Sequence, residues 1–431
     1  MRSFREDLAR SNLDLALARF YAGEGISAGP GVKNAVVRVE MPDMGFAHSS
    51  AVGKANAGSD APMTPDHQFH LASVAKTMTA TLLLQLWEEG ALGPCGLDAT
   101  LAGLALFDEE IAARLNMIDG VSYGKKITVR HLLTHTSGIK DAVVDDATGT
   151  AHDYGEPAPG SYGARLRKAI PAHLACLADP ACDISTLVTS KEWTMWDPAC
   201  PEDKEAGVIN WFLASGTAAA SLSPPGEAFH YSDTGYVILG LLSEKLSGKS
   251  LHRQWRERIF DPLGMDKSYL AYAKDPEPDP WTYTVSDFYL GDVPYVTSRI
   301  NVSFDRGGGG VVSTAADVVR FLRALIDGQL FKNTETLATM LQWRTFPGIS
   351  SPRAGVGLGI FAEGSGQGRV ALGHSGAYGA KMYFEPENGI YFSGTVNQRT
   401  GVPYYWWKEM FAAIHQACSG GAGEPIIAVS T

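Results

Sequence analysis

The chain has 431 residues, 45% of them hydrophobic and 19% charged, which is enough material for two or three domains with an ordinary buried core. Its 36 basic and 47 acidic residues leave a formal net charge of −11, which argues against nucleic acid or anionic lipid as a partner. The sequence starts without the apolar segment of a signal peptide, and it has no run of about 18 apolar residues that could span a bilayer. We expect no membrane partner and a cytoplasmic location.

The first ninety residues predict a helix, two strands and a second helix. Leucines recur among charges over residues 5–20, which favours an amphipathic helix. Valines alternate with charges over 35–40, and a weaker strand pattern covers 46–52. Residues 73–89 have helical periodicity, and the helix is expected to end at Gly90.

The middle of the chain is less regular. A short amphipathic helix is predicted over 128–135, and two longer helices over 235–247 and 251–260. Between them, residues 139–224 are rich in Pro, Gly, Asp, Ala and Trp and have weak periodicity. A stretch of that length is either a functional lid or contains helices that its pattern does not resolve.

The last 125 residues begin with a glycine run, Gly307–Gly310, which predicts a tight backbone passage near the cleft, and continue with a helix over 315–327. Strand-like runs then alternate with turns, and Asn388-Gly389 is typical of a hairpin. The predicted strands are 356–362, 369–373, 380–384 and 390–396, and a final helix covers 404–418.

Strands near both ends and helices between them predict an α/β (α+β) fold, in which an antiparallel sheet is flanked by terminal helices. A mainly helical domain is inserted in the middle. The expected boundaries are 1–95 and 300–431 for the α/β domain and 96–299 for the insertion, which includes the lid-like segment 139–224.

The five cysteines form no Cys-x-x-Cys pair. An odd number without paired spacing predicts neither a disulfide scaffold nor a structural zinc site. Cys176, Cys182 and Cys200 share one loop-rich stretch where a local bridge can form, although reduced thiols are the favoured expectation. We expect no metal and no cofactor.

The segment Ser73-Val-Ala-Lys76 is the first candidate for chemistry. Residues three apart on a helix lie on the same face, so the ammonium group of Lys76 can reach the hydroxyl of Ser73. A serine hydroxyl is a poor nucleophile until a neighbouring base takes its proton. Alone, this spacing is common, and a capping serine beside a solvated lysine is then the favoured explanation.

Two further segments carry candidate residues. Tyr231-Ser-Asp233 precedes an apolar helix, and a tyrosine can deliver a proton when a nearby cation stabilises its phenolate. Gly373-His374-Ser375-Gly376-Ala377 follows a strand-like run, where small residues allow backbone N–H groups to approach a substrate. Each segment alone is equally typical of a core tyrosine or of a tight turn.

Together, the order and separation of the three segments resemble the signatures of the penicillin-recognising serine hydrolases. That superfamily includes class C β-lactamases, DD-peptidases, D-aminopeptidases, D-amino-acid amidases and β-lactamase-like carboxylesterases. Supporting blocks are similar too, and the resemblance runs from about residue 65 to residue 397, except for the long segment after Ile139. The resemblance implies a β-lactamase/transpeptidase-like fold.

The resemblance also implies roles. Ser73 would form an acyl-enzyme, Lys76 and Tyr231 would share the proton transfers, and the backbone N–H groups of Ser73 and Ala377 would form the oxyanion hole. Asp233, His374, Ser375 and Gly376 would contact the substrate. Water would then release the acyl group.

Two residues depart from the pattern of the β-lactam-directed members. Asp233 stands where these usually have Asn, and His374 stands where β-lactamases usually have Lys. Asp233 adds a negative charge, and His374 is a weaker cation than Lys. Both changes disfavour a carboxylate-bearing substrate such as a penicillin. An acid near Lys76 would also keep the lysine protonated and shift the role of base toward Tyr231.

The leading hypothesis is therefore a carboxylesterase or amidase of small acyl substrates. A D-amino-acid amidase or D-aminopeptidase is the alternative, because Asp233 can attract a free amine. A β-lactamase or DD-peptidase, an acyltransferase and a catalytically dead binding protein stay open behind them.

His131 and His135 have metal-ligand spacing, but no third ligand is evident, and a structural role is the favoured explanation. The oligomeric state stays open.

Overall fold

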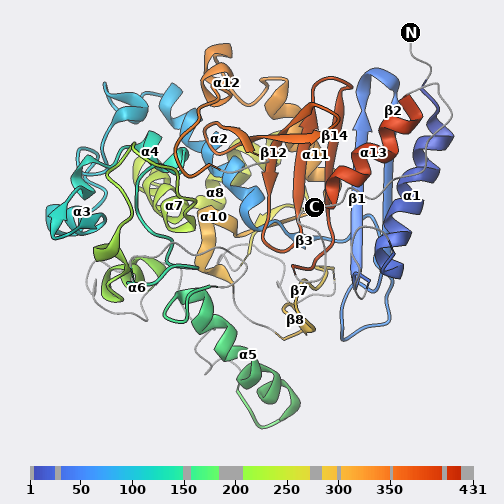
Figure 1. Ribbon diagram of the computed structural model, residues 1–431, viewed down its shortest axis with the longest axis horizontal. Helices are drawn as coiled ribbons and strands as arrows, with labels where there is room; N and C mark the ends of the chain where they lie inside the picture. The colour runs from blue at the N-terminus through green and yellow to red at the C-terminus, as the bar shows by residue number, and fades with distance from the viewer. Residues whose placement is uncertain are drawn as a thin grey trace.

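A seven-stranded antiparallel sheet contains strands from both ends of the chain (Figure 1). The computed structural model describes residues 4–24, 31–148, 157–183, 207–271, 284–298, 302–349, 353–399 and 405–418. In spatial order the strands are β10 (Arg353–Val356), β11 (Phe361–Gly366), β12 (Arg369–Ser375), β13 (Lys381–Glu385), β14 (Ile390–Thr395), β1 (Asn34–Met41) and β2 (Phe46–Gly53).

Alternate side chains of the sheet enter two different cores, because successive residues of a strand point to opposite faces. Val37 and Tyr383 belong to a cluster with the terminal helices α1 (Glu6–Ala22) and α13 (Trp407–Cys418). Their neighbours Val36 and Met382 belong to the larger core on the other face. Figure 1 shows α1 and α13 together on the outer side of the sheet.

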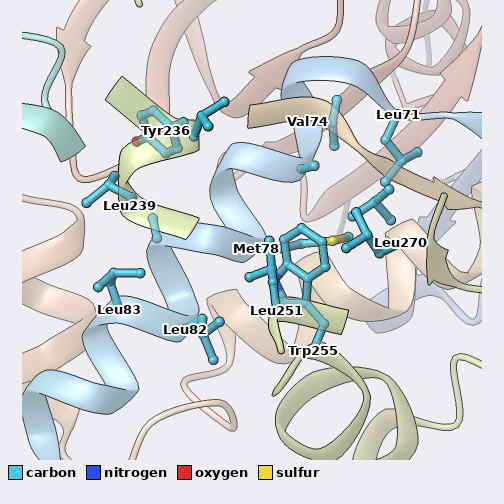
Figure 2. Packing of buried hydrophobic residues seen from close by; sticks show 14 of the residues in the cluster. Leu71, Val74, Met78, Leu82, Leu83, Tyr236, Leu239, Leu251, Trp255 and Leu270 are labelled. Atoms are coloured by element: carbon cyan, nitrogen blue, oxygen red, sulfur yellow. The ribbon is translucent and has the colours of Figure 1, made fainter. Parts of the chain in front are cut away.

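The larger core lies between the sheet and a helical region. Its central element is α2 (Ala75–Glu88), which packs against α7 (Asp233–Ser247) and α10 (Arg306–Gly309). Figure 2 shows side chains of α2 in one cluster with Tyr236 and Leu239 of α7 and with the two end residues of α8 (Leu251–Trp255). The remaining helices are α3 (Glu109–Arg114), α4 (Val129–Leu133), α5 (Tyr162–Ala178), α6 (Val208–Ala214), α8 (Leu251–Trp255), α9 (Asp261–Leu263), α11 (Ala315–Ile326) and α12 (Thr334–Met340).

A small antiparallel sheet joins the segments that lead to the site. Its order is β3 (Phe69–His70), β9 (Val311–Ser313) and β6 (Tyr269–Leu270). β3 leads directly into the turn that carries Ser73, and β9 directly follows the glycine run. Pairing of Phe69 with Ser313 therefore fixes these two segments side by side. The two remaining sheets are hairpins, β4 (Met117–Ile118) with β5 (Val121–Ser122) and β7 (Tyr289–Leu290) with β8 (Val293–Pro294).

The predicted fold class is confirmed, and most predicted elements occur within a few residues of their expected bounds. One strand prediction was wrong: the run 356–362 is divided between β10 and β11, because Gly359 has a φ of 72° and turns the chain. The predicted helix 251–260 changes to a π-helical turn over Arg256–Phe260. The domain boundaries stay a prediction.

Within the lid-like segment, two helices that the sequence pattern did not resolve lie among the described residues, α5 and α6. In Figure 1, α5 projects from the body of the molecule.

The expectation of reduced thiols was wrong for two cysteines, because Cys176 and Cys182 form a disulfide at the end of α5. Cys200 lies outside the described residues.

Candidate active site

Ser73 lies in a 3-10 turn, Ala72–Val74, that runs into α2. Ala72, directly before it, has a φ of 46°, a conformation that costs a non-glycine residue about 1 kcal/mol or more and commonly occurs at functional sites. The Ser73 Oγ is 3.2 Å from the Lys76 Nζ, and both residues are buried. The predicted contact between these two residues is thus present.

Lys76 has three hydrogen-bond acceptors around its ammonium group. Besides Ser73, it donates to a carboxylate oxygen of Asp233 and to the carbonyl oxygen of Gly308, the latter at 2.6 Å. Burial alone would lower the pKa of Lys76, but electrostatic interactions, chiefly with Asp233, outweigh it and hold the pKa well above its ordinary value. Lys76 is therefore an ammonium ion in the resting site, as the sequence predicted from Asp233.

Tyr231 lies beside Lys76 and against the imidazole ring of His135. The Lys76 Nζ is 5.1 Å from the centroid of the Tyr231 ring, and the rings of Tyr231 and His135 stack at 4.2 Å. His135 is itself fixed by a hydrogen bond from the backbone N–H of Ser232 to its Nδ1, at 3.1 Å. Burial raises the pKa of Tyr231 above its ordinary value, although Lys76 lowers it in part, so the phenol also holds its proton at rest.

Asp233 is the first residue of α7, whose N-cap is Ser232. Its carboxylate contacts Lys76, and its backbone N–H donates to the Oδ2 of Asp141 at 3.1 Å. The prediction placed Asp233 beside the substrate, and the structure places it on the wall of the same pocket as Ser73. Its carboxylate is in direct contact with Lys76. The structure therefore supports an effect of Asp233 on the protonation of Lys76 more directly than a contact of Asp233 with the substrate.

The third predicted segment ends β12, and its residues have different surroundings. Ala377 lines the pocket next to Ser73. His374 lies behind Tyr231, with ring centroids 6.1 Å apart, and its Nδ1 donates to the carbonyl oxygen of Ser375 at 2.9 Å. The Ser375 Oγ lies 2.6 Å from the Tyr383 hydroxyl, which belongs to the core under the terminal helices. The side chain of Ser375 therefore stabilises the sheet. A contact between the main chain of Ser375 and the substrate stays a prediction.

Gly376 allows β12 to approach the turn that carries Ser73. A Cβ on this residue would lie 2.3 Å from the carbonyl oxygen of Leu71 and 3.2 Å from the Cβ of Ala72. Such a contact is far inside van der Waals distance, so a side chain here would push the strand and the turn apart. The small residue predicted at this position thus brings Ala377 close to Ser73.

A pocket of about 70 Å³ lies beside Ser73. Its apolar wall includes Val143, Leu166 and Phe304, and Gly163 and Arg167 of α5 also line it. Charged residues of both signs face it, namely Asp233, Asp305, Arg167 and Arg399. The pocket can hold a small acyl group with an apolar part and a charged part.

Sequence reasoning missed Asp305, Arg167 and Arg399. For Asp305 a signal was present, because it stands two residues before the glycine run, which was interpreted as a tight backbone passage near the cleft. The passage is confirmed: Gly308 accepts from Lys76, and a Cβ on Gly307 would lie 2.6 Å from the carbonyl oxygen of Tyr236. Burial and the charge of Asp233 raise the pKa of Asp305 well above its ordinary value.

His131 and His135 both have structural roles. His131 completes a capping box with Thr128 at the start of α4, and His135 supports Tyr231. No group of three possible metal ligands is found within the described residues. Among the helices of the described ranges, none is long and apolar enough to cross a membrane.

The family model for Beta-lactamase matches residues 43–406. Penicillin-binding protein 4 of Amycolatopsis lactamdurans is 29% identical over 292 residues, which are 66% of this chain and 57% of that protein. Lovastatin esterase of Penicillium rubens is 24% identical over 423 residues, 92% of this chain and 90% of the esterase. The structure of D-amino acid amidase from Ochrobactrum anthropi covers 96% of this chain and 99% of its own, with a TM-score of 0.65 and 21% identity.

Fold and family model together define a protein of the β-lactamase fold. The chain belongs to the beta-lactamase family, within the penicillin-recognising serine hydrolases that its motifs resemble. It spans about half the length of the penicillin-binding proteins that it matches, 57% and 51% of two of them.

Proposed function

We propose that this protein hydrolyses small esters or amides through an acyl-enzyme on Ser73. The observation that carries the proposal is the 3.2 Å contact between the Ser73 Oγ and the Lys76 Nζ at the wall of the small pocket. A serine beside a pocket and in contact with a group that can take its proton is the arrangement that nucleophilic acyl transfer requires. The substrate is a small molecule with an acyl group that fits beside Val143, Leu166 and Phe304.

Proton transfer starts from a protonated Lys76 and a protonated Tyr231. Lys76 can take the proton of Ser73 only after it has lost its own proton to solvent, a step that its contact with Asp233 opposes. The Ser73 Oγ then bonds to the acyl carbon as the carbonyl oxygen gains charge. Tyr231, resupplied by Lys76, gives a proton to the departing alcohol or amine. Water repeats the attack and leaves the acid and the free serine.

The backbone N–H groups of Ser73 and Ala377 are proposed to hold the carbonyl oxygen as it gains charge. Support comes from the position of both residues on one pocket and from the close approach that Gly376 allows. Each such donor typically lowers the barrier by about 3 kcal/mol.

A D-amino-acid amidase or D-aminopeptidase is the second candidate. It is favoured by two carboxyl groups, Asp233 and Asp305, on the pocket that contains Ser73. Either group can attract the free amine of an amino-acid amide. The structural likeness to the amidase of Ochrobactrum anthropi is compatible with this candidate.

Turnover of a substrate panel tests the proposal. The panel contains p-nitrophenyl esters of short acids, D- and L-alaninamide, and a cephalosporin, each with wild type and with Ser73→Ala. We expect hydrolysis of at least one ester or amide, lost in the variant, and poor turnover of the cephalosporin. Turnover that survives in Ser73→Ala would contradict the proposal, and preferred turnover of the cephalosporin would move the assignment to a β-lactamase.

A further inference from the structure

Asp305 is a buried carboxyl group without a hydrogen-bond partner for one of its oxygens. Its residue is 9% exposed, and within the described part of the chain no group bonds to its Oδ1. It lines the same pocket as Ser73. Leaving a carboxyl oxygen unsatisfied in the interior costs folding free energy, so its presence indicates a ligand rather than a structural contact.

The glycine run accommodates this carboxyl group. A Cβ on Gly308 would lie 2.0 Å from the Asp305 Oδ1, and a Cβ on Gly309 would lie 2.1 Å from its Oδ2. Any side chain at either position would occupy the space of the carboxyl oxygens. Gly308 and Gly309 are thus the residues that allow Asp305 to lie next to the site.

Lys76 has no N–H left for Asp305. An ammonium group has three N–H donors, and those of Lys76 are matched by Ser73, Asp233 and the carbonyl oxygen of Gly308. Asp233 is likewise engaged, because its carboxylate contacts Lys76. Among the described residues, Asp305 is therefore the carboxyl group of the pocket that has an oxygen without a hydrogen-bond donor, although Lys76 lies nearby.

We propose that Asp305 binds the ammonium group of the acyl part of the substrate, so that the preferred substrates are amides or esters of small apolar amino acids with a free amine. The proposal rests on the hydrolase function proposed above and names its substrate class. It moves amine recognition from Asp233, where the sequence placed it, to Asp305. The side chain of the amino acid contacts Val143, Leu166 and Phe304.

The electrostatics of the pocket agree with this occupant. Burial and the charge of Asp233 raise the pKa of Asp305, and the charge of Lys76 opposes this only in part, so the carboxyl group favours its neutral form. A bound ammonium favours the ionised carboxylate and forms an ion pair in a site of low dielectric. Arg167 and Arg399 also line the pocket, so a carboxylate-bearing ligand is the competing occupant that the experiment must include.

Binding to the Ser73→Ala protein, measured by calorimetry, tests the proposal without interference from turnover. The ligands are D- and L-alaninamide, the neutral analogue propionamide, and the anionic succinamate. We expect at least one alaninamide to bind about tenfold or more tightly than propionamide. In the double variant Ser73→Ala with Asp305→Asn, the ratio of the affinities for alaninamide and propionamide should fall to within about twofold of one. The control is Ser73→Ala with Asp66→Asn, at a surface residue paired with Lys267, and it should retain the ratio.

The readout is the ratio of the affinities for alaninamide and propionamide, because this ratio separates binding of the amine from a general effect on Lys76. Equal ratios with and without Asp305, or tightest binding of succinamate, would overturn the proposal. If the double variant with Asp305→Asn does not fold, the single variant Ser73→Ala still tests the proposal. An affinity for alaninamide no higher than that for propionamide would contradict it. Hydrolysis of a neutral p-nitrophenyl ester by wild type reports on the hydrolase function alone, so the two failures are distinguishable.

Discussion

Lys76 determines the protonation of the groups around it, because it is buried between Ser73, Asp233 and Gly308. Its raised pKa means that the site spends most of its time with an ammonium ion that cannot act as a base. Activity then depends on how readily this ion releases a proton. Asp233 is the residue with the largest influence on that step, because its charge is the strongest effect that raises the pKa of Lys76.

Asp233→Asn should move the acidic limb of the rate profile to lower pH. The neutral amide removes the charge that raises the pKa of Lys76, so a larger fraction of the lysine is neutral at any given pH. It should also improve acylation by a penicillin relative to a neutral ester. The measurement is kcat/KM for both substrates from pH 5 to 9; an unmoved limb with an unchanged ratio would contradict this role.

Lys76→Ala and Tyr231→Phe should each reduce turnover by orders of magnitude, and the double variant should lose little more than the worse single variant. Groups on one proton path are strongly non-additive. Steady-state kinetics on one ester gives the three values. Losses that multiply in full would mean that the two residues act separately.

The contact of Ser73 with Lys76 and the position of Ala377 next to Ser73 could be predicted from sequence, because the spacing is local or follows a recurring pattern. Ser73 and Lys76 lie three residues apart, and Tyr231 and Ala377 lie in short segments of fixed composition. Asp305 could not be predicted, because its place beside Lys76 depends on the packing of Gly308 and Gly309 against distant residues. Ser375 was expected to contact the substrate, and the sequence could not show that its side chain bonds to Tyr383, because that contact depends on the pairing of β12 with β13.

At the level of elements, the site is the junction of β12, the turn before α2, the N-terminus of α7 and the glycine run. Helices and strands with strong periodicity, such as α2 and β1, could be predicted closely from sequence. The segment 139–224 could not, because its periodicity is weak and its helices α5 and α6 are stabilised by packing on the rest of the molecule.

Gly376→Ala should lower both stability and turnover. Its Cβ would lie 2.3 Å from the carbonyl oxygen of Leu71, so β12 and the turn of Ser73 must separate. We expect a loss of about 1–3 kcal/mol in the free energy of unfolding and at least about tenfold in kcat. The matched control is Gly364→Ala in β11, where a Cβ meets no atom within 4 Å.

Denaturant unfolding and ester kinetics give both values. The control should stay within about 0.5 kcal/mol of wild type. A Gly376→Ala protein with the stability and kcat of wild type would show that the close approach of strand and turn is not required.

In the whole molecule, Ser73 lies where the large sheet meets the helical region, and the small sheet of β3, β9 and β6 connects the two sides of the site. Its buried polar groups link stability to pH. His70 in β3 is 3% exposed, and burial lowers its pKa to about 4.

Stability should fall as pH decreases from 6.5 to 4, in part because of His70. The unfolded chain binds a proton at His70 below its ordinary pKa of 6.5, whereas the folded protein resists protonation until about pH 4. A shift of that size corresponds to about 3 kcal/mol at the acidic end of the window. Denaturant unfolding at several pH values should show a shallower slope for His70→Gln, and an identical slope would contradict the assignment.

The most direct test of the central claim is to locate the acylated residue. The protein is incubated with a slow ester or with a phosphonate, and the adduct is measured by intact mass and then mapped by peptide mass spectrometry. The account predicts one adduct, on Ser73, which is absent in Ser73→Ala. An adduct on Ser375 or Ser137, or one that persists in Ser73→Ala, would contradict the account.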